Sequence, residues 1–312
     1  MQLYRITVKP VMSFSSQLQS DTFFGAFCWN YRYYCGETEL EYMLKGMREG
    51  HPSVIFSNAF PKDTLPLPLG IRDTSMNFED IEKKEERKRA FQNHKKLKGA
   101  RFVRREWFEK IMEGDYNGFT AGLAEDGYQE QTVMHNMVSR QAGTVMKLGE
   151  SGNLYDESEV FTDAEQEYDI YLLSSLDSQI LKEVIERMFL LGIGRNKSVG
   201  KGAFEVKVWL EEPPFTPANN ANGYMALSNF VPARHDPTDG WYKTLVKYGK
   251  LDREYAASEI PFKKPVLFLQ AGAIFYDDEV KEYYGKCLEG VSIRKEIVTS
   301  GYTIAMPMHL EI

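Results

Sequence analysis

Hydrophobic residues follow two different periods along this chain, and together these periods predict a mixed α+β protein. Residues 2–9 alternate between apolar and polar side chains, with Tyr4, Ile6 and Val8 on one face, which is typical of a β-strand. Apolar residues recur at helical spacing over residues 176–191. The same two patterns predict further helices over residues 20–31 and 37–47 and further strands over residues 53–60, 168–173 and 203–210.

The order of these elements predicts a ferredoxin-like, or RRM-like, first domain. Its β-α-β…β-α-β sequence occupies residues 1–212 and is interrupted by an insertion over about residues 75–165. A structureless loop of that length would be unusual in a compact domain. We therefore expect the insertion to contain helices and hairpins of its own and to have a function.

The pattern of apolar residues in the C-terminal third of the chain predicts a second, degenerate copy of the same fold. Proline and asparagine residues over 211–223 form a linker, which places the second domain at residues 213–312. Within this domain the pattern predicts strands over residues 224–230, 264–270, 272–276 and 302–310 and a helix near residues 239–248.

The amino-acid composition indicates which class of protein this is and in which cellular compartment we expect it. No stretch approaches the ~18 apolar residues of a membrane-spanning helix, and the N-terminus lacks an apolar signal core. The three cysteines form no C-x-x-C pair, so a disulfide framework and a cysteine-based zinc site are not expected. These features predict a cytoplasmic protein that does not bind membranes.

Charge is distributed unevenly along the chain. The net charge is −7, yet residues 83–110 contain twelve Lys or Arg and four Glu, which gives this segment a charge of +8. A basic region within an acidic protein suggests that one anionic ligand binds in one place. A solvated helix with Glu–Lys pairs is the competing interpretation for residues 82–89, but not for residues 95–105, whose only charges are positive.

A basic glycine loop over residues 192–204 follows the helix at residues 176–191, for which Ser175 or Asp177 offers an N-cap. A Walker loop is excluded because it requires a glycine where Arg195 stands, and because a helix precedes the loop. A Rossmann fingerprint is excluded because Lys197 stands at its third glycine position. The residues indicate either a loop that grips a polyanion or an ordinary helix-to-strand connection with a glycine C-cap at residue 192 or 194.

Other candidate ligand contacts are scattered through the sequence. Ser20 and Asp21 begin a helix whose free N–H groups could receive a phosphate, although Asp21 would repel one, and an ordinary N-cap is equally compatible. His135 and Arg140 could stack on unpaired bases or contact a nucleic-acid backbone, although a lone histidine is more often structural or simply exposed. Helical spacing places three phenylalanines in the core, at positions 23, 24 and 27, and leaves an aromatic cluster without an assigned role, at Tyr31, Tyr33 and Tyr34.

Five segments together resemble a known family. They are residues 20–28, the end of the glycine loop at 200–204, residues 301–307, and two stretches of the insertion at 135–143 and 152–155. With these motifs the whole chain resembles the RAMP superfamily, and within it the family of the fourth subunit of type III-A CRISPR Csm complexes. The glycine loop is shared widely in the superfamily, whereas the helix start and the C-terminal strand favour this family.

The resemblance implies two tandem ferredoxin-like domains and a non-catalytic, RNA-binding role in antiviral defence. Such a subunit of the ribonucleoprotein binds the 5′ tag of crRNA, caps the filament of backbone RAMP subunits and docks the large polymerase-type signature subunit. Its inserted hairpin, the thumb, is expected to press into the guide–target RNA duplex. No metal, cofactor or catalytic residue is implied. The expected RNA-binding residues are Ser20, Asp21, His135, Arg140, Gly194, Arg195, Asn196, Lys197, Ser198, Gly200, Lys201 and Gly202.

Two rival functions remain open on the sequence. A metal-independent endoribonuclease that cuts CRISPR repeats would use histidine with a second acid or base. The five histidines form no recognisable pair, and Gln19 stands where an imidazole would precede the Ser20 helix start. Asp21 lies near the position at which backbone subunits carry a cutting acid, but no metal-ligand cluster surrounds it. An RRM-type protein unrelated to CRISPR would need more aromatic residues than residues 203–208 offer. We therefore expect binding without cleavage.

Overall fold

The structure is a computed structural model in which most of the chain is described. The described residues are 1–15, 17–73, 99–125, 127–136, 138–139, 141–145, 147–148, 151–152, 154–213, 215 and 220–311. The predicted RNA contact Arg140 and the basic residues from 83 to 98 lie outside this part of the chain.

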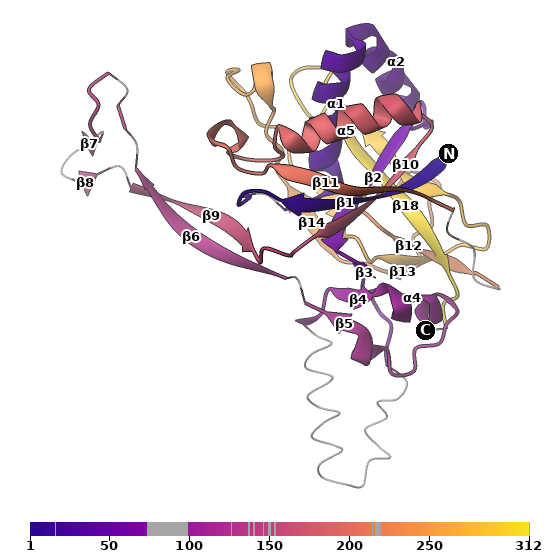
Figure 1. Ribbon diagram of the computed structural model, residues 1–312. Coiled ribbons are helices and arrows are strands. Elements are labelled where there is room, and N and C mark those ends of the chain that lie inside the picture. The colour runs from indigo at the N-terminus through magenta and orange to yellow at the C-terminus, as the bar shows by residue number, and fades with distance from the viewer. Residues whose placement is uncertain are drawn as a thin grey trace, which may run out of the picture.

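Two antiparallel sheets form the frame of the molecule, so the expected α+β class is confirmed (Figure 1). The first sheet has the order β11-β1-β10-β2. Its strands are β1 (Gln2–Pro10), β2 (Val54–Pro61), β10 (Tyr168–Ser174) and β11 (Phe204–Glu212). All four match the strands that the alternation of apolar residues predicts. Tyr4, Ile6 and Val8 are buried together, as that alternation requires.

Helices cover one face of the first sheet (Figure 1). They are α1 (Ser20–Cys35) and α5 (Ser178–Leu190), whereas α2 (Glu37–Arg48) packs beside α1. The side chain of Asp177 caps α5 by accepting hydrogen bonds from the backbone N–H groups of Gln179 and Ile180, each at 3.0 Å. Phe23, Phe24 and Phe27 of α1 are buried in the core, which confirms the interpretation drawn from their helical spacing.

The second sheet is built from the C-terminal third of the chain and has the order β13-β16-β12-β18-β17. Its strands are β12 (Gly223–Ala226), β13 (Gly240–Trp241), β16 (Ile274–Tyr276), β17 (Tyr283–Leu288) and β18 (Thr299–Met308). Every position of β18 is buried, in agreement with the predicted closing strand.

The helix predicted near residues 239–248 is wrong. This stretch contains β13 and β14 (Thr244–Lys247), and β14 pairs with β15 (Val266–Leu269). Leu245 lies opposite Phe268, which is buried, and Val246 lies opposite Leu267 on the exposed face. Cross-strand partners far along the chain therefore determine the conformation of a segment whose local pattern was ambiguous.

The two sheets meet at the β2 edge of the first one. The backbone N–H of Asn58 donates to the carbonyl of Leu227, at 2.9 Å. The side chain of Asn58 also donates to that of Asn229, at 3.2 Å. β18 packs beside β2 at the same junction. These contacts fix the second sheet against β2.

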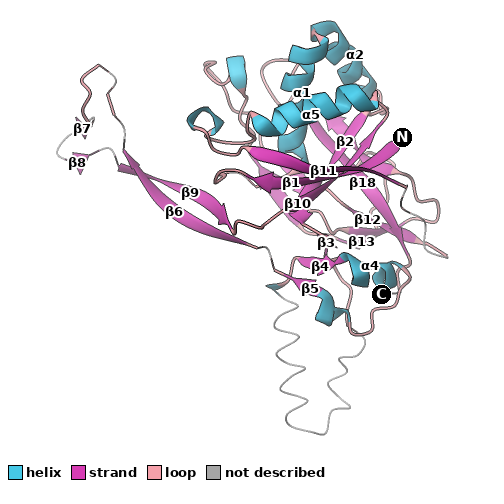
Figure 2. Cartoon of the chain, in the orientation of Figure 1, coloured by secondary structure: helices cyan, strands magenta, loops and turns pink. Residues whose placement is uncertain are grey.

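The insertion contains elements of its own, as expected. Near the body of the molecule, β3 (Thr64–Pro66), β4 (Phe102–Arg104) and β5 (Leu123–Ala124) form a small sheet beside α4 (Arg105–Met112). Farther out, β6 (Tyr128–Asn136) pairs with β9 (Leu154–Thr162), and β7 (Lys147–Leu148) pairs with β8 (Ser151–Gly152). The β6–β9 hairpin projects away from the rest of the molecule (Figure 2).

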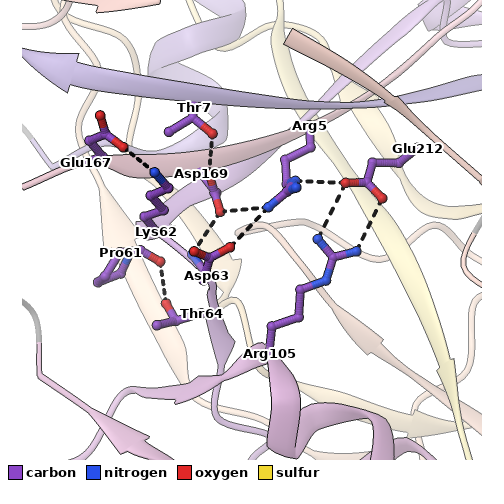
Figure 3. Close-up of polar contacts among 10 residues, drawn as sticks. All are labelled: Arg5, Thr7, Pro61, Lys62, Asp63, Thr64, Arg105, Glu167, Asp169 and Glu212. Carbon is purple, nitrogen blue, oxygen red and sulfur yellow. Dashed lines mark hydrogen bonds and ion pairs between the residues drawn. The ribbon is translucent and has the colours of Figure 1, made fainter. Parts of the chain in front are cut away.

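A cluster of charged residues around the buried Asp169 joins the insertion to the first sheet (Figure 3). Asp169 is fully buried and accepts a hydrogen bond from Thr7 Oγ1, at 2.6 Å, and one from the backbone N–H of Asp63, at 2.9 Å. Arg5 pairs with Glu212, at 2.7 Å, and Glu212 also pairs with Arg105 of α4, at 3.2 Å. The sheet face opposite the helices is therefore covered by the base of the insertion.

Candidate nucleic-acid interface

The glycine loop is a closed structure with its own hydrogen bonds. Backbone φ is positive at Gly192, Gly194, Asn196, Gly200 and Gly202, so five of its residues adopt a conformation that favours glycine. The backbone N–H of Ile193 donates to the carbonyl of Gly202, at 2.8 Å, and closes the loop at its base. A short 3₁₀ turn, η3 (Lys197–Val199), lies between these ends. Gly192 also ends α5 with a positive φ, so the loop begins with the expected glycine cap.

The loop is attached to the segment that follows β1. The N–H of Gly202 donates to the carbonyl of Ser13, and the N–H of Val11 donates to the carbonyl of Ala203, each at 2.9 Å. The side chain of Ser13 points to the same region, where its hydroxyl donates to Glu159 of β9, at 2.9 Å. The segment after β1, the glycine loop and the inserted hairpin therefore meet at one place.

Side chains of the hairpin and the loop form a polar cluster that we call the clasp. It consists of His135, Glu157, Glu159, Arg195, Asn196 and Lys201. Lys201 pairs with Glu159 and Asn196 donates to Glu157. His135 Nε2 lies 3.2 Å from Glu159 and 3.8 Å from Glu157, and Arg195 lies 3.8 Å from Glu157. The clasp thus brings together four of the residues that the sequence predicts to bind RNA.

Carboxylates of the chain itself neutralise the lysines of the glycine loop. Glu159 is 4% exposed. Burial raises the pKa of this carboxyl, but hydrogen bonds from Lys201, Ser13 and His135 outweigh burial, and the pKa lies below its ordinary value. Lys197 pairs with Asp252, and burial lowers the pKa of the Lys197 amine although Asp252 opposes the shift. Both lysines therefore hold the loop in place through buried pairs.

Arg195 is the exposed cation of the loop. Its side chain is 66% exposed, compared with the largely buried side chains of Lys197 and Lys201. Ser198 and Gly200 are exposed beside it. A ligand that approaches the loop would first meet the Arg195 guanidinium and the backbone of these two residues.

The imidazole of His135 has an aromatic neighbour as well as its two carboxylates. Its ring stacks on Tyr155 of β9, with centroids 5.5 Å apart and an interplanar angle of 23°. His135, Glu157 and Glu159 are also a donor set of the kind that can hold a metal ion. The ammonium group of Lys201 already binds Glu159, so the chain supplies its own cation at this carboxylate.

Ser20 and Asp21 form their contacts with residues outside the clasp. The helix begins at Ser20, as expected, but Gln19 is the N-cap residue, and no side chain caps this helix start. Ser20 is buried and its N–H donates to Asn58 Oδ1, at 3.1 Å. Asp21 pairs with Lys247 of β14. The Ser20 hydroxyl also donates to the carbonyl of Asn229, at 3.4 Å, so both side chains connect α1 to the C-terminal third of the chain rather than to the clasp.

The open sheet face of an RRM-type RNA-binding protein is not present in the described part of the chain. Register places Arg5 opposite Tyr171 and Thr7 opposite Asp169 on the face away from the helices. Tyr171 and Asp169 are buried there beneath the insertion. Bases therefore have no exposed aromatic platform on this sheet, and the glycine loop and the hairpin remain as the candidate interface.

Sequence reasoning missed the acidic members of the clasp and its second acidic neighbour, Asp252. One signal was available for the hairpin. Glu157 and Glu159 are two residues apart in a stretch with alternating character, so in a strand both carboxylates share one face. What the sequence lacks is the tertiary placement of that face against the glycine loop.

The fold and this interface define an α+β protein of two antiparallel sheets, with a glycine loop held by an inserted hairpin. No family model matches the sequence, and no curated protein matches it. Within the described residues, no helix is long and apolar enough to cross a membrane.

Solved structures share this fold over the full chain length. The chain is similar to a chain in the crystal structure of a Csm1-Csm4 cassette in complex with pppApA, with a TM-score of 0.60, 18% identity and 99% of each chain covered. A Csm1-Csm4 cassette in complex with AMPPNP gives a TM-score of 0.61 and 17% identity, with 100% of each chain covered. A chain of the Csm3-Csm4 subcomplex in the type III-A CRISPR-Cas interference complex gives a TM-score of 0.61 and 15% identity, with 99% of this chain and 100% of the other covered. The fold is thus that of subunits of type III CRISPR Csm complexes.

Glu159→Gln is expected to loosen the hairpin from the glycine loop at neutral pH, because an amide cannot form the ion pair with Lys201. Since the folded pKa of Glu159 lies below its ordinary value, about 4.3, the ionic contribution is complete above that pH and is lost as pH falls through the folded pKa. We expect hydrogen exchange in β9 to be faster in the variant at pH 7 and equal to that of the native chain in acid. Glu165→Gln, at a side chain 94% exposed, is the control. Equal β9 protection at pH 7 would contradict the clasp.

Proposed function

We propose that this chain is the RNA-binding subunit that holds the 5′ tag of crRNA in a type III-A CRISPR interference complex. In this role it caps the filament of backbone RAMP subunits and docks the large signature subunit. The similar structures support this proposal, because Csm4 is the one subunit named in both the Csm1-Csm4 and the Csm3-Csm4 complexes. The match covers nearly all of this chain and of the chains it resembles.

Two tandem ferredoxin-like domains fit the strand orders. In the first sheet, the strands of the β-α-β…β-α-β series lie in the order 4-1-3-2, which is that of β11-β1-β10-β2. The second sheet repeats this order as β18-β12-β16-β13, with β17 added at the outer edge. No α-helix is found among its described residues, which supports the description of the second copy as degenerate.

The observation that carries the proposed function is the clasp. It places the exposed guanidinium of Arg195 beside Glu157, midway along the β6–β9 ladder of the thumb hairpin, with the exposed backbone of Gly200 in the same glycine loop. Backbone N–H groups and arginine are common ligands for RNA phosphates. An RNA strand that runs along the glycine loop would then pass directly beneath the hairpin, as a guide held at its 5′ end requires.

One observation favours the rival endoribonuclease. His135 and Lys201 bind the same carboxylate, so an imidazole and an amine lie near each other, as in metal-independent cleavage. We favour binding without catalysis because the amine of Lys201 is already paired with the buried Glu159, which removes it as a free acid or base beside His135.

The purified full-length chain, mixed with labelled CRISPR-repeat RNA in EDTA, tests the proposed function. The expected result is a bound and uncut RNA. Cleavage at one site that is abolished by His135→Ala would assign the rival nuclease function. Absence of binding by the chain, both alone and with its partner subunits, would contradict an RNA-binding role altogether.

A further inference from the structure

A group of aromatic and arginine side chains lies on the surface beside the glycine loop. It comprises Trp29 and Tyr33 of α1, Tyr255 and Arg253 of η4 (Arg253–Tyr255), and Arg294; we call it the platform. Trp29 stacks on Tyr33, with centroids 6.0 Å apart, and meets the Tyr255 ring edge-on, at 5.2 Å. In Figure 1 the orange turn around residue 255 lies beside α1. Tyr33 belongs to the aromatic cluster that had no role on the sequence.

Arginines lie over the rings of the platform. The Arg294 guanidinium is 4.3 Å from the Tyr255 centroid, and that of Arg253 is 5.9 Å from the Tyr33 centroid. Arg294 has an ion-pair partner in Glu296, at 3.5 Å. Among the described residues Arg253 forms no ion pair, so its charge remains available to an anion.

Arg253 is held in an uncommon conformation. Its backbone φ is +50°, although it is not a glycine, and its Nε is buried without a hydrogen-bond partner among the described residues. A left-handed conformation is unfavourable for a residue with a side chain. Strained backbone clusters at binding and active sites, and a buried donor without a partner calls for an explanation such as a ligand.

The platform is continuous with the glycine loop. Lys197 of the loop pairs with Asp252, and Asp252 accepts a hydrogen bond from the N–H of Arg253, at 2.7 Å. One residue therefore separates the buried lysine of the loop from the free arginine of the platform. Tyr33 presents its ring at 44% exposure on the outer side.

We propose that the platform binds unpaired nucleotides of the RNA strand on its way to or from the glycine loop. Bases stack on the exposed ring of Tyr33, beside the half-buried ring of Tyr255, and the Arg253 guanidinium takes the adjoining phosphate. Aromatic rings with arginine form the general chemistry of single-strand binding, which is independent of base sequence. This inference rests on the proposed function, and it extends the interface from the glycine loop to the outer side of α1.

The test measures binding of a labelled CRISPR-repeat RNA to the full-length chain and to three variants. Tyr33→Leu removes the aromatic ring but keeps an apolar side chain, and Arg253→Gln removes the charge but keeps a polar one. Each substitution is expected to weaken RNA binding roughly tenfold. Tyr42→Leu on α2, at a ring 78% exposed, is the matched control and should bind as the native chain does. Thermal unfolding confirms that each variant is folded. With 4-thiouridine in the RNA, crosslinks to residues 253–255 are expected.

The outcomes separate the platform from the proposed function. If the native chain binds the RNA and both platform variants bind it as tightly as Tyr42→Leu, the platform proposal is overturned and the proposed function stands. If the variants retain RNA affinity but no longer co-purify with a partner subunit, the surface is a protein docking site and the proposal is also overturned. If the native chain binds no RNA, either alone or with its partner subunits, both proposals fall.

Discussion

Gly202→Ala is expected to reduce guide-RNA affinity roughly 100-fold, which corresponds to about 3 kcal/mol. Gly202 has a φ of +73°, and a Cβ at this position would lie inside van der Waals contact of the backbone carbonyl of Ile193. The N–H of Ile193 donates the hydrogen bond that closes the loop, so Ile193 cannot move away from the new Cβ without opening the base of the loop. Titration of labelled RNA against the folded variant measures the loss.

Gly200→Ala is the matched control for this prediction. Gly200 also has a positive φ, of +87°, but nothing lies within 4 Å of a Cβ at this position. Its substitution adds the cost of the left-handed conformation, about 1–2 kcal/mol, without a clash. We expect the loss of RNA affinity to be clearly smaller than for Gly202→Ala. Equal losses would mean that the closure at Ile193 is unimportant.

Asp169→Leu is expected to lower the free energy of unfolding by about 3–5 kcal/mol, the usual effect of breaking a buried charged network from one side. The substitution leaves the Thr7 hydroxyl and the Asp63 N–H without their acceptor on a buried sheet face. It also removes a carboxylate 3.6 Å from Arg5. Urea unfolding followed by circular dichroism measures the change.

Glu165→Gln is the control for the Asp169 prediction, because its ion pair with Lys9 is on the surface. We expect a change within about 0.5 kcal/mol. An Asp169→Leu protein as stable as this control would show that the network in Figure 3 does not anchor the insertion.

Local periodicity predicts those helices and strands whose buried positions recur at a regular spacing in their own sequence. β1 and α5 both place their periodic apolar residues in the main core, so the strand and helix periods are visible without knowledge of their neighbours. The segment at residues 239–248 has no such dominant period, and its pairing with β15 decides its conformation. β17 was missed because Gly285 and Lys286 interrupt its alternation and it pairs with only one strand, β18.

The candidate site could be predicted in part. The charge and glycine content of residues 192–204 identify the loop, but they cannot show that Lys197 and Lys201 are paired with Asp252 and Glu159, which lie 55 and 42 residues away in the chain. Those pairs change the expected roles. Arg195 becomes the residue that faces a ligand, and the two lysines become residues that hold the loop and the hairpin together.

The affinity of labelled guide RNA, measured over a range of salt concentrations for the native chain and for Arg195→Ala, tests the central claim most directly. If Arg195 grips a phosphate, its removal weakens binding and reduces the slope of log affinity against log salt by about 0.7, the value for one single-strand contact. Unchanged affinity and slope would contradict the assignment of the glycine loop as the RNA-binding site.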